Sequence, residues 1–311
     1  MYTTGSSDDA LKSWLRSARK AKPNVLFLVV DDLRPWLGCY GVPFMKTPNM
    51  DQLAIRSVRF DRAYIQHGIC GPSRASFMTG RRSDTTRVMN LESYFRETGG
   101  NFTTVSQYFK ENGYIAEGIG KIFHSGHSGG ETADYPHSWS TKFDKARETL
   151  TVPNKKASSV RPVKEKGGEL HDTRIASRAI LRLRDYATKP DKPFFLAVGF
   201  KKPHLPFMFP EQYQASYNQT DIPLAAHRET PAHVTELALT SFGELRNNYQ
   251  DIKKLNLTPP SYRIPDDYQL KLRKGYAAAV SYIDAQIGRV LTALREAGFD
   301  NNTIITLHSD H

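Results

Sequence analysis

The sequence has few cysteines and no long hydrophobic run. Its two cysteines, Cys39 and Cys70, cannot form a framework of several disulfide bonds. No stretch approaches the roughly 18 apolar residues that a membrane span needs, and the apolar run 25–30 has the length of a strand. Residues 1–22 are rich in charge and lack the hydrophobic segment of a secretory signal. We therefore expect a basic tail over 1–22 and no membrane span; either the protein stays inside the cell, or the natural start lies upstream.

Positive charge is in excess, with 43 Lys and Arg against 32 Asp and Glu and a net charge of +11. This excess suits an acidic partner, such as nucleic acid, an anionic membrane or a sulfated polysaccharide, but it is equally typical of a soluble basic surface. Four N-x-Ser/Thr sequons, more than the one or two that chance provides, favour a secretory route. They begin at Asn101, Asn218, Asn256 and Asn301.

Apolar runs alternate with amphipathic segments, a pattern that predicts an α/β fold with a mainly parallel central sheet flanked by helices. We expect strands at 25–30, 114–119, 194–198 and 303–307. Helices are expected from Thr47-Pro48, over 102–112, after Asp172 as a cap, and over 268–297. Residues 125–170 lose apolar periodicity and suggest a partly disordered surface insertion. Because the chain stops just after a strand, we expect 23–311 to be a partial domain whose sheet is incomplete.

Acidic residues follow two of these strands: Asp31 and Asp32 after the first, and Asp310, with His311, after the last. Residues just beyond strand carboxyl ends line the ligand crevice of open parallel sheets. Three carboxylates meeting there would repel one another unless a cation neutralised them, and oxygen ligands favour Ca²⁺ or Mg²⁺. The alternative is that these aspartates only cap helices.

Residues 70–81 read Cys-Gly-Pro-Ser-Arg-Ala-Ser-Phe-Met-Thr-Gly-Arg and place Cys70 at the start of a predicted helix, where an anion is favoured. This run resembles the C-x-P-S-R…T-G-R motif of type I sulfatases, which directs conversion of its cysteine to formylglycine. Gly113-Tyr114 and the segment 120–124, Gly-Lys-Ile-Phe-His, resemble the second sulfatase motif. Ala116 departs from it by replacing Ser or Thr, and we expect only a packing difference there.

Further segments are similar to the iduronate-2-sulfatase branch of this family. They are Asp-Asp-Leu-Arg-Pro at 31–35, Gly-Cys-Tyr-Gly at 38–41, and residues 80–87, 101–113 and 194–207. The Asp310-His311 pair also fits this branch, since many sulfatases carry Asn in place of His311. The similarity runs from about residue 24 to the end, except over 125–170.

The resemblance implies a sulfuric ester hydrolase that removes 2-O-sulfate from terminal iduronate of heparan and dermatan sulfate. Its hydrated formylglycine, formed at Cys70, would attack sulfur with one hydroxyl and expel sulfate with the other. Ca²⁺ would be bound by Asp31, Asp32, Cys70, Asp310 and His311. The other implied roles are nucleophile support by Arg74, sulfate binding by Lys121, proton transfer by His124 and His204, and carboxylate binding by Arg34 and Lys202.

The same resemblance implies a sulfated glycosaminoglycan substrate, a formylglycine-generating enzyme as partner, no nucleic acid, and a lysosomal or secreted location. Two alternatives remain open. One is another sulfatase or phosphoesterase of the wider alkaline-phosphatase superfamily, such as a choline-sulfatase-like enzyme. The other is a truncated chain that binds polyanions without turnover. His204 could also merely satisfy a loop carbonyl, and Cys39 is interpreted as a packed residue.

Overall fold

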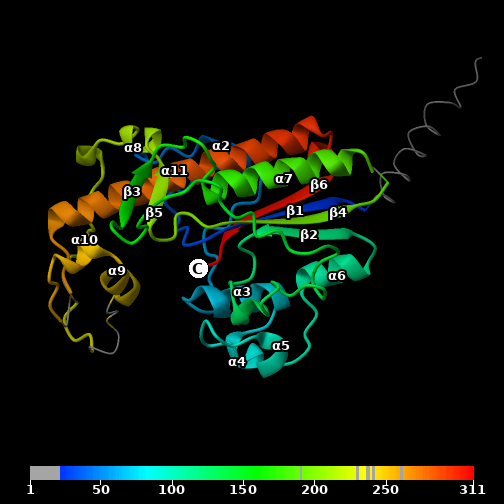
Figure 1. The fold of residues 1–311 in the computed structure, drawn as a ribbon, viewed down its shortest axis with the longest axis horizontal. Coiled ribbons are helices and arrows are strands. Elements are labelled where there is room, and N and C mark those ends of the chain that lie inside the picture. The colour runs from blue at the N-terminus through cyan, green and yellow to red at the C-terminus, as the bar shows by residue number, and fades with distance from the viewer. Residues whose placement is uncertain (1–21, 190, 229–230, 236–238, 240–241, 260–261) are drawn as a thin grey trace, which may run out of the picture.

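The centre of the protein is a four-stranded parallel sheet in the order β2-β4-β1-β6 (Figure 1). The computed structural model describes residues 22–189, 191–228, 231–235, 239, 242–259 and 262–311, so nearly all of the expected basic tail lies outside the described residues. The strands are β1 (Asn24–Val30), β2 (Ile115–Gly120), β4 (Phe194–Phe200) and β6 (Thr303–Ser309). All four predicted strands are confirmed, and every pairing in this sheet is parallel.

Helices cover both faces of the sheet, which confirms the predicted α/β class (Figure 1). On one side lie α7 and α11, which pack against each other, with α2 against α11. On the other side lie α3, α4, α5 and α6. The helices are α2 (Pro48–Ile55), α3 (Cys70–Thr79), α4 (Ser83–Thr86), α5 (Phe95–Thr98), α6 (Val105–Glu111), α7 (His171–Ala187), α8 (Gln212–Ala215), α9 (Gly243–Asn248), α10 (Gln250–Lys253) and α11 (Asp266–Glu296). Short 3₁₀ turns are η1 (Gly38–Tyr40), η2 (His127–Gly129), η3 (Gln219–Asp221) and η5 (Asp300–Asn302).

Strand β1 divides its side chains between two hydrophobic cores. Leu26, Leu28 and Val30 pack into the core under α7 and α11, whereas Val25 and Val29 pack into the core over α3. This follows from the two-residue alternation of a strand that is covered on both faces. Burying both faces holds the sheet rigid, so the residues that follow its strands have a fixed support.

The long helix α11 carries the expected buried stripe. Its members with no exposed surface include Tyr282, Ile283, Ile287, Val290 and Leu294. Among the described residues, no helix combines the length and the apolar character needed to cross a membrane.

The segment 125–170 differs from the expected surface insertion. It contains β3 (Val160–Val163), which pairs in parallel with β5 (Phe207–Pro210). Trp139, only 1% exposed, packs in the core over α3, and its Nε1 donates to the Ala133 carbonyl at 2.6 Å. Irregular segments bury anchors of this kind without helical or strand periodicity, which is why the pattern suggested a surface loop.

Candidate functional site

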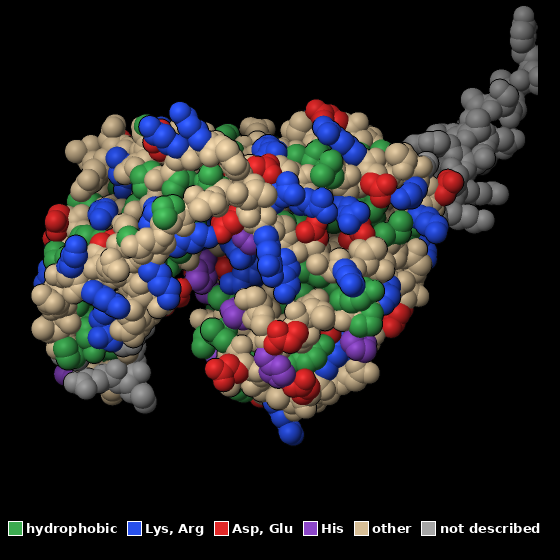
Figure 2. All heavy atoms as spheres, in the orientation of Figure 1, with side chains coloured by type: hydrophobic (Ala, Val, Ile, Leu, Met, Phe, Trp, Pro, Cys, Tyr) green, Lys and Arg blue, Asp and Glu red, His purple; other side chains and the backbone are tan. Residues whose placement is uncertain are grey.

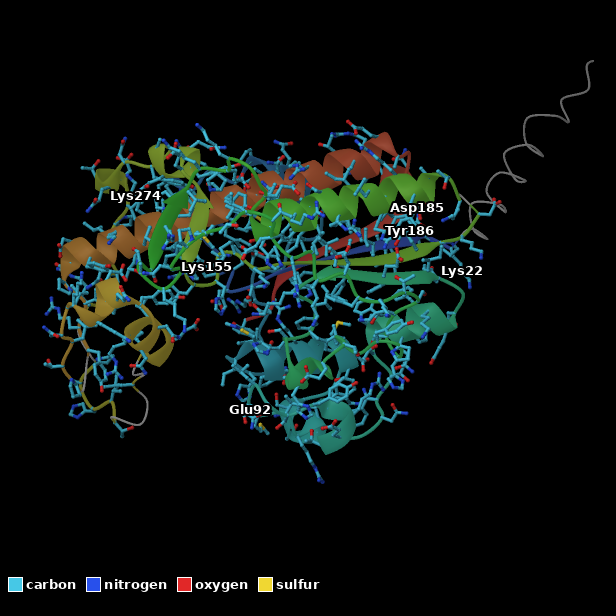
Figure 3. The ribbon with its side chains drawn as sticks, in the orientation of Figure 1. Lys22, Glu92, Lys155, Asp185, Tyr186 and Lys274 are labelled. Carbon is cyan, nitrogen blue, oxygen red and sulfur yellow. The ribbon has the colours of Figure 1, made fainter. Side chains whose placement is uncertain are left out.

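The carboxyl ends of the four parallel strands bring the candidate residues together. Val30 of β1 lies opposite Phe200 of β4 and Ser309 of β6, so the residues that follow these strands emerge side by side. They include Asp31 and Asp310, and the chain ends beside them at the point marked C in Figure 1. Figure 2 shows a notch at this end of the sheet, with basic and histidine side chains at its head. Lys22, labelled in Figure 3, lies at the opposite end of the sheet.

Helix α3 presents its N-terminus to these strand ends. Cys70 is its first residue, as predicted, and Gly80, whose φ of 63° is left-handed, caps the helix after Thr79. Arg74 is fully buried one turn into the helix. Its Nη2 lies 3.1 Å from Asp31 Oδ1, and its Nε donates to Asp310 Oδ2 at 3.0 Å. One guanidinium therefore joins the aspartates of two strands.

Lys121, just after β2, adds a second positive charge, with Nζ 2.5 Å from Asp31 Oδ2. Burial by itself would raise the pKa of Asp31, but Arg74 and Lys121 hold that pKa well below its usual range. Burial, together with the charge of Asp31, raises the pKa of Asp310 despite its contact with Arg74. Asp31 is thus the fixed negative charge of the pair, and Asp310 is the member that would gain most from another cation.

Four side chains form a group that could hold a metal ion: Asp31, Cys70, Asp310 and His311. Their ligand atoms all lie within 4.8 Å of one another. Two ligands on opposite sides of Ca²⁺, each about 2.4 Å away, would be separated by about that distance. His311 Nε2 also lies 3.0 Å from Asp32 Oδ1, so the fifth predicted ligand borders the group. Two of the four donors are carboxylates and Asp32 would add a third, and these oxygen ligands fit a hard divalent cation.

Two histidines near this group have pKa values that are shifted in opposite directions. Burial would lower the pKa of His204, but a hydrogen bond with Cys70 and the charges of Asp31 and Asp32 raise it to about 9. Burial and the positive charge of Lys121 lower the pKa of His124. The pKa of His204 is therefore raised and that of His124 lowered, so His204 is the better proton donor of the two and His124 the better acceptor. Sites that pair an acid with a base separate two titratable groups in this way.

The loop after β1 carries Asp32 and Arg34. Asp32 has a φ of 61°, a conformation rarely adopted by a non-glycine residue and one that often marks a functional site. Tyr276 of α11 stabilises the loop: its hydroxyl donates to the Asp32 carbonyl at 2.7 Å and accepts from the Arg34 N–H at 2.8 Å. The Arg34 side chain is exposed, as a substrate-binding residue must be.

Lys202, which we expected to contact substrate, is placed differently. The residue is 8% exposed, and its Nζ donates to the His204 carbonyl and, at 3.0 Å, to the Pro206 carbonyl. Burial lowers the pKa of its ammonium to about 8. The ammonium therefore supports the loop that carries His204. The sequence Lys-Pro-His at 202–204 gives no signal that separates this supporting role from substrate contact.

Asp172 was expected to cap α7, but the capping position belongs to Leu170. The buried carboxylate of Asp172 instead accepts a hydrogen bond from the Lys201 N–H at 2.5 Å, where β4 passes into the His204 loop. Ser73 was also missed by the sequence reasoning, and its hydroxyl donates to the Asp310 carbonyl. Its place in the C-x-P-S-R run was the only available signal. No local sequence pattern predicted that Tyr276 would contact a strand end so distant in the sequence.

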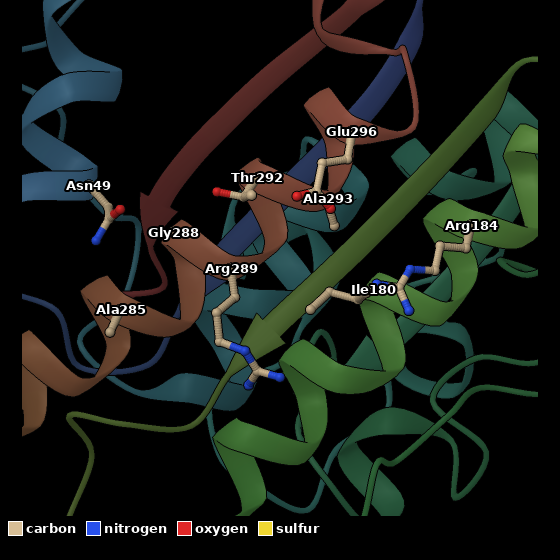
Figure 4. Close-up of a pocket in the computed structure, with 9 residues that line it drawn as sticks. All are labelled: Asn49, Ile180, Arg184, Ala285, Gly288, Arg289, Thr292, Ala293 and Glu296. Carbon is tan, nitrogen blue, oxygen red and sulfur yellow. The ribbon is translucent and has the colours of Figure 1, made fainter.

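A separate hollow of about 360 Å³ lies on the outer face of the helices, between α7 and α11 (Figure 4). Arg184 and Arg289 border it, together with Asn49 and Glu296. None of the residues that follow the sheet strands lines it. The chemistry-bearing groups are at the strand ends, so we take the notch as the candidate site.

A buried arginine thus joins two strand-end aspartates, and a cysteine stands at the adjoining helix N-terminus. The sulfatase family model matches residues 23–311, and the chain belongs to this family.

Among its relatives is the iduronate 2-sulfatase of Mus musculus, 43% identical over 93% of this chain and 54% of its own length. A choline-sulfatase of Rhizobium meliloti is 27% identical over 93% of this chain and 57% of its own. A phosphonate monoester hydrolase from Silicibacter pomeroyi has the same fold, with a TM-score of 0.67, 22% identity, and coverage of 93% and 62%. The chain thus spans a little over half the length of the relatives it matches.

Proposed function

We propose that the protein is a sulfuric ester hydrolase that removes 2-O-sulfate from a terminal iduronate of heparan or dermatan sulfate. The observation that carries this proposal is the position of Cys70, whose sulfur shares a metal-binding group with Asp31, Asp310 and His311. The 43% identity to an iduronate 2-sulfatase, against 27% to a choline-sulfatase, supports the choice within the family.

Asp31, Asp32, Asp310, His311 and position 70 would hold one divalent cation, which we propose to be Ca²⁺. When bound, the ion would add positive charge beside the sulfate oxygens. Arg74, which already joins Asp31 to Asp310, fixes the spacing of the two carboxylates before any ligand arrives. This preorganisation means that little of the site needs to rearrange when the charge of the sulfate ester enters.

Position 70 is a cysteine in the structure, and its sulfur stands where formylglycine would place its hydroxyls. We propose this modification, which a formylglycine-generating enzyme would make, because a hydrated aldehyde supplies both an attacking hydroxyl and a second one that can expel sulfate. His124, whose pKa is lowered, would take a proton from this diol, and His204, whose pKa is raised, would give one to the leaving sugar oxygen. Lys121 would contact the sulfate oxygens with its ammonium.

Removing divalent cations with EDTA is expected to lower both sulfatase activity and the unfolding temperature. Ligand binding to the folded state alone stabilises by about 2.7 kcal/mol at a hundredfold excess over Kd. Calorimetry with and without EDTA measures the shift. Asp31→Asn should lose the response, whereas Asp61→Asn, on an exposed side chain, should keep it. Chelation that changed neither activity nor stability would contradict the metal site.

The substrate proposal predicts a preference that competition can measure. Offered a 2-O-sulfated iduronate disaccharide and choline sulfate at equal concentration, the protein should hydrolyse the disaccharide faster. The reason is that exposed Arg34 can bind the uronate carboxylate, a group choline sulfate lacks. Arg34→Glu should therefore reduce kcat/KM for the disaccharide far more than for an aryl sulfate. Faster hydrolysis of choline sulfate would contradict the proposed substrate but would not contradict the proposed sulfatase reaction.

We further propose a lysosomal or secreted location with N-glycosylation, supported by the four sequons. Each of their asparagines, Asn101, Asn218, Asn256 and Asn301, is exposed. Polyanion binding without turnover stays the second candidate function, because the net charge of +11 would support it without chemistry. A protein that binds heparan sulfate but releases no sulfate would establish that alternative.

A further inference from the structure

Two arginines that lie far apart in sequence pack against one tryptophan beside the candidate site. The guanidinium carbon of Arg34 lies 4.7 Å from the ring centre of Trp36, and that of Arg273 lies 4.4 Å from it. Phe44 and Tyr276 hold the indole edge-on at 5.3 and 5.8 Å. The indole therefore has a fixed orientation, and it supports both guanidiniums through their faces.

Neither guanidinium forms an ion pair with a carboxylate in the part of the chain that the structure describes. Arg273 Nε is buried and has no hydrogen-bond partner among these residues. Burial and the like charge of Arg34 lower the pKa of Arg273. Two like charges held on one ring, with no carboxylate paired to either among the described residues, would be stabilised by an anion that bound both.

The arginine pair is fixed to the catalytic end of the sheet. Tyr276, one helical turn after Arg273 in α11, bonds through its hydroxyl to the backbone of both Asp32 and Arg34. The ring of Tyr276 also meets that of Phe207, just after the His204 loop, at 5.6 Å. Through Tyr276, α11 therefore fixes the two guanidiniums relative to the loop that carries Asp32.

We infer that Arg34, Trp36 and Arg273, together called the Trp36 platform, form a subsite for a sugar carboxylate, with Arg273 as a second specificity-determining cation. The inference rests on the proposed function and names how it selects a uronate. Guanidinium forks match carboxylate geometry, and stacking through their faces leaves the N–H groups free to donate. A carboxylate adjacent to the scissile ester on the same sugar is the group that this position can reach.

The test compares a 2-O-sulfated uronate disaccharide with the same disaccharide after its carboxyl group is reduced to an alcohol. The measured quantity is the ratio of the two kcat/KM values. We expect Arg273→Gln to lower this ratio roughly tenfold to a hundredfold, because the lost contact involves only the carboxylate. Arg273→Lys, which keeps the charge but loses the fork, should give an intermediate ratio. Lys274→Gln, the same charge change at the next residue of α11 (Figure 3), is the control.

An unchanged ratio in Arg273→Gln would overturn the subsite, as would an equal loss with both substrates. If Arg273→Gln does not fold, the ratio in Arg273→Lys decides, and a wild-type ratio there counts against the inference. Failure of the proposed function looks different, because the wild-type protein would then release sulfate from neither disaccharide. Loss of the uronate preference as salt rises would support the inference further, since salt screens exposed charge pairs.

Discussion

Replacement of Cys70 by alanine is expected to abolish turnover, with kcat falling roughly 10⁴-fold or more. The protein should be made in cells that convert sulfatase cysteines, and hydrolysis of an aryl sulfate measures the loss. The fall is large because alanine supplies neither an attacking group nor a second hydroxyl to expel sulfate. Little structural loss should accompany it, since the thiol contributes only a 3.3 Å contact to His311 and a hydrogen bond with His204.

Mass spectrometry of the Cys70 peptide is the companion measurement, and it should find the aldehyde in the wild-type protein. Cys39→Ala is the matched control: this partly buried thiol packs beside the core under α7 and α11 and lies outside the metal-binding group. Its removal should leave turnover within about twofold, as for substitutions away from the chemistry. A fully active Cys70→Ala protein would refute the formylglycine mechanism.

Arg74→Met is expected to lower the free energy of unfolding by about 3–5 kcal/mol, the range for removing one partner of a buried ion pair. The guanidinium is fully buried and contacts Asp31 and Asp310, both 1% exposed. Without it, Asp31 would keep Lys121 as its cationic partner, Asp310 would keep only its ion-pair contact with His311, and the carbonyls of Lys121 and Ile122 would lose a donor. Urea unfolding in the presence of EDTA measures the loss without a compensating cation.

Arg82→Met provides the comparison. Its side chain is 78% exposed and lies 3.8 Å from Asp84, an exposed pair of the kind worth at most about 1 kcal/mol. Equal stability losses in Arg74→Met and Arg82→Met would show that the buried bridge does not hold the strand ends together.

The parallel sheet and the candidate residues at its carboxyl edge could be predicted, because each depends on a local sequence pattern. Apolar runs such as 25–30 predict buried parallel strands, and polar residues that follow them, such as Asp31, must then lie at the carboxyl edge of the sheet. The order of the strands could not be predicted, because β1 pairs with β4 and β6 through backbone groups that every residue carries. The direction of a side chain could not be predicted either. Lys202 and Arg34 are both basic residues near proline, yet the Lys202 ammonium is buried under a loop and Arg34 is exposed.

The contacts missed at the site are those that join distant segments through a single atom. Tyr276 reaches Asp32 across 244 positions, and Asp172 reaches Lys201 across 29. A tyrosine within an amphipathic helix or an aspartate in its first turn is fully explained by local preference. Only the packing of α11 and α7 on the sheet selects these residues for a further role.

The pairing of β1 with β6 has a consequence for biosynthesis. The Asp32 N–H bonds to the Asp310 carboxylate across 278 positions, so this junction cannot close until β6 has left the ribosome. Until then the nascent chain carries a central strand with one edge unpaired, and Arg74 lacks one of its two aspartates. Contacts this distant slow folding and prolong exposure of strand edges. The newly made chain should therefore depend on chaperones for longer than an α-helical protein of equal length.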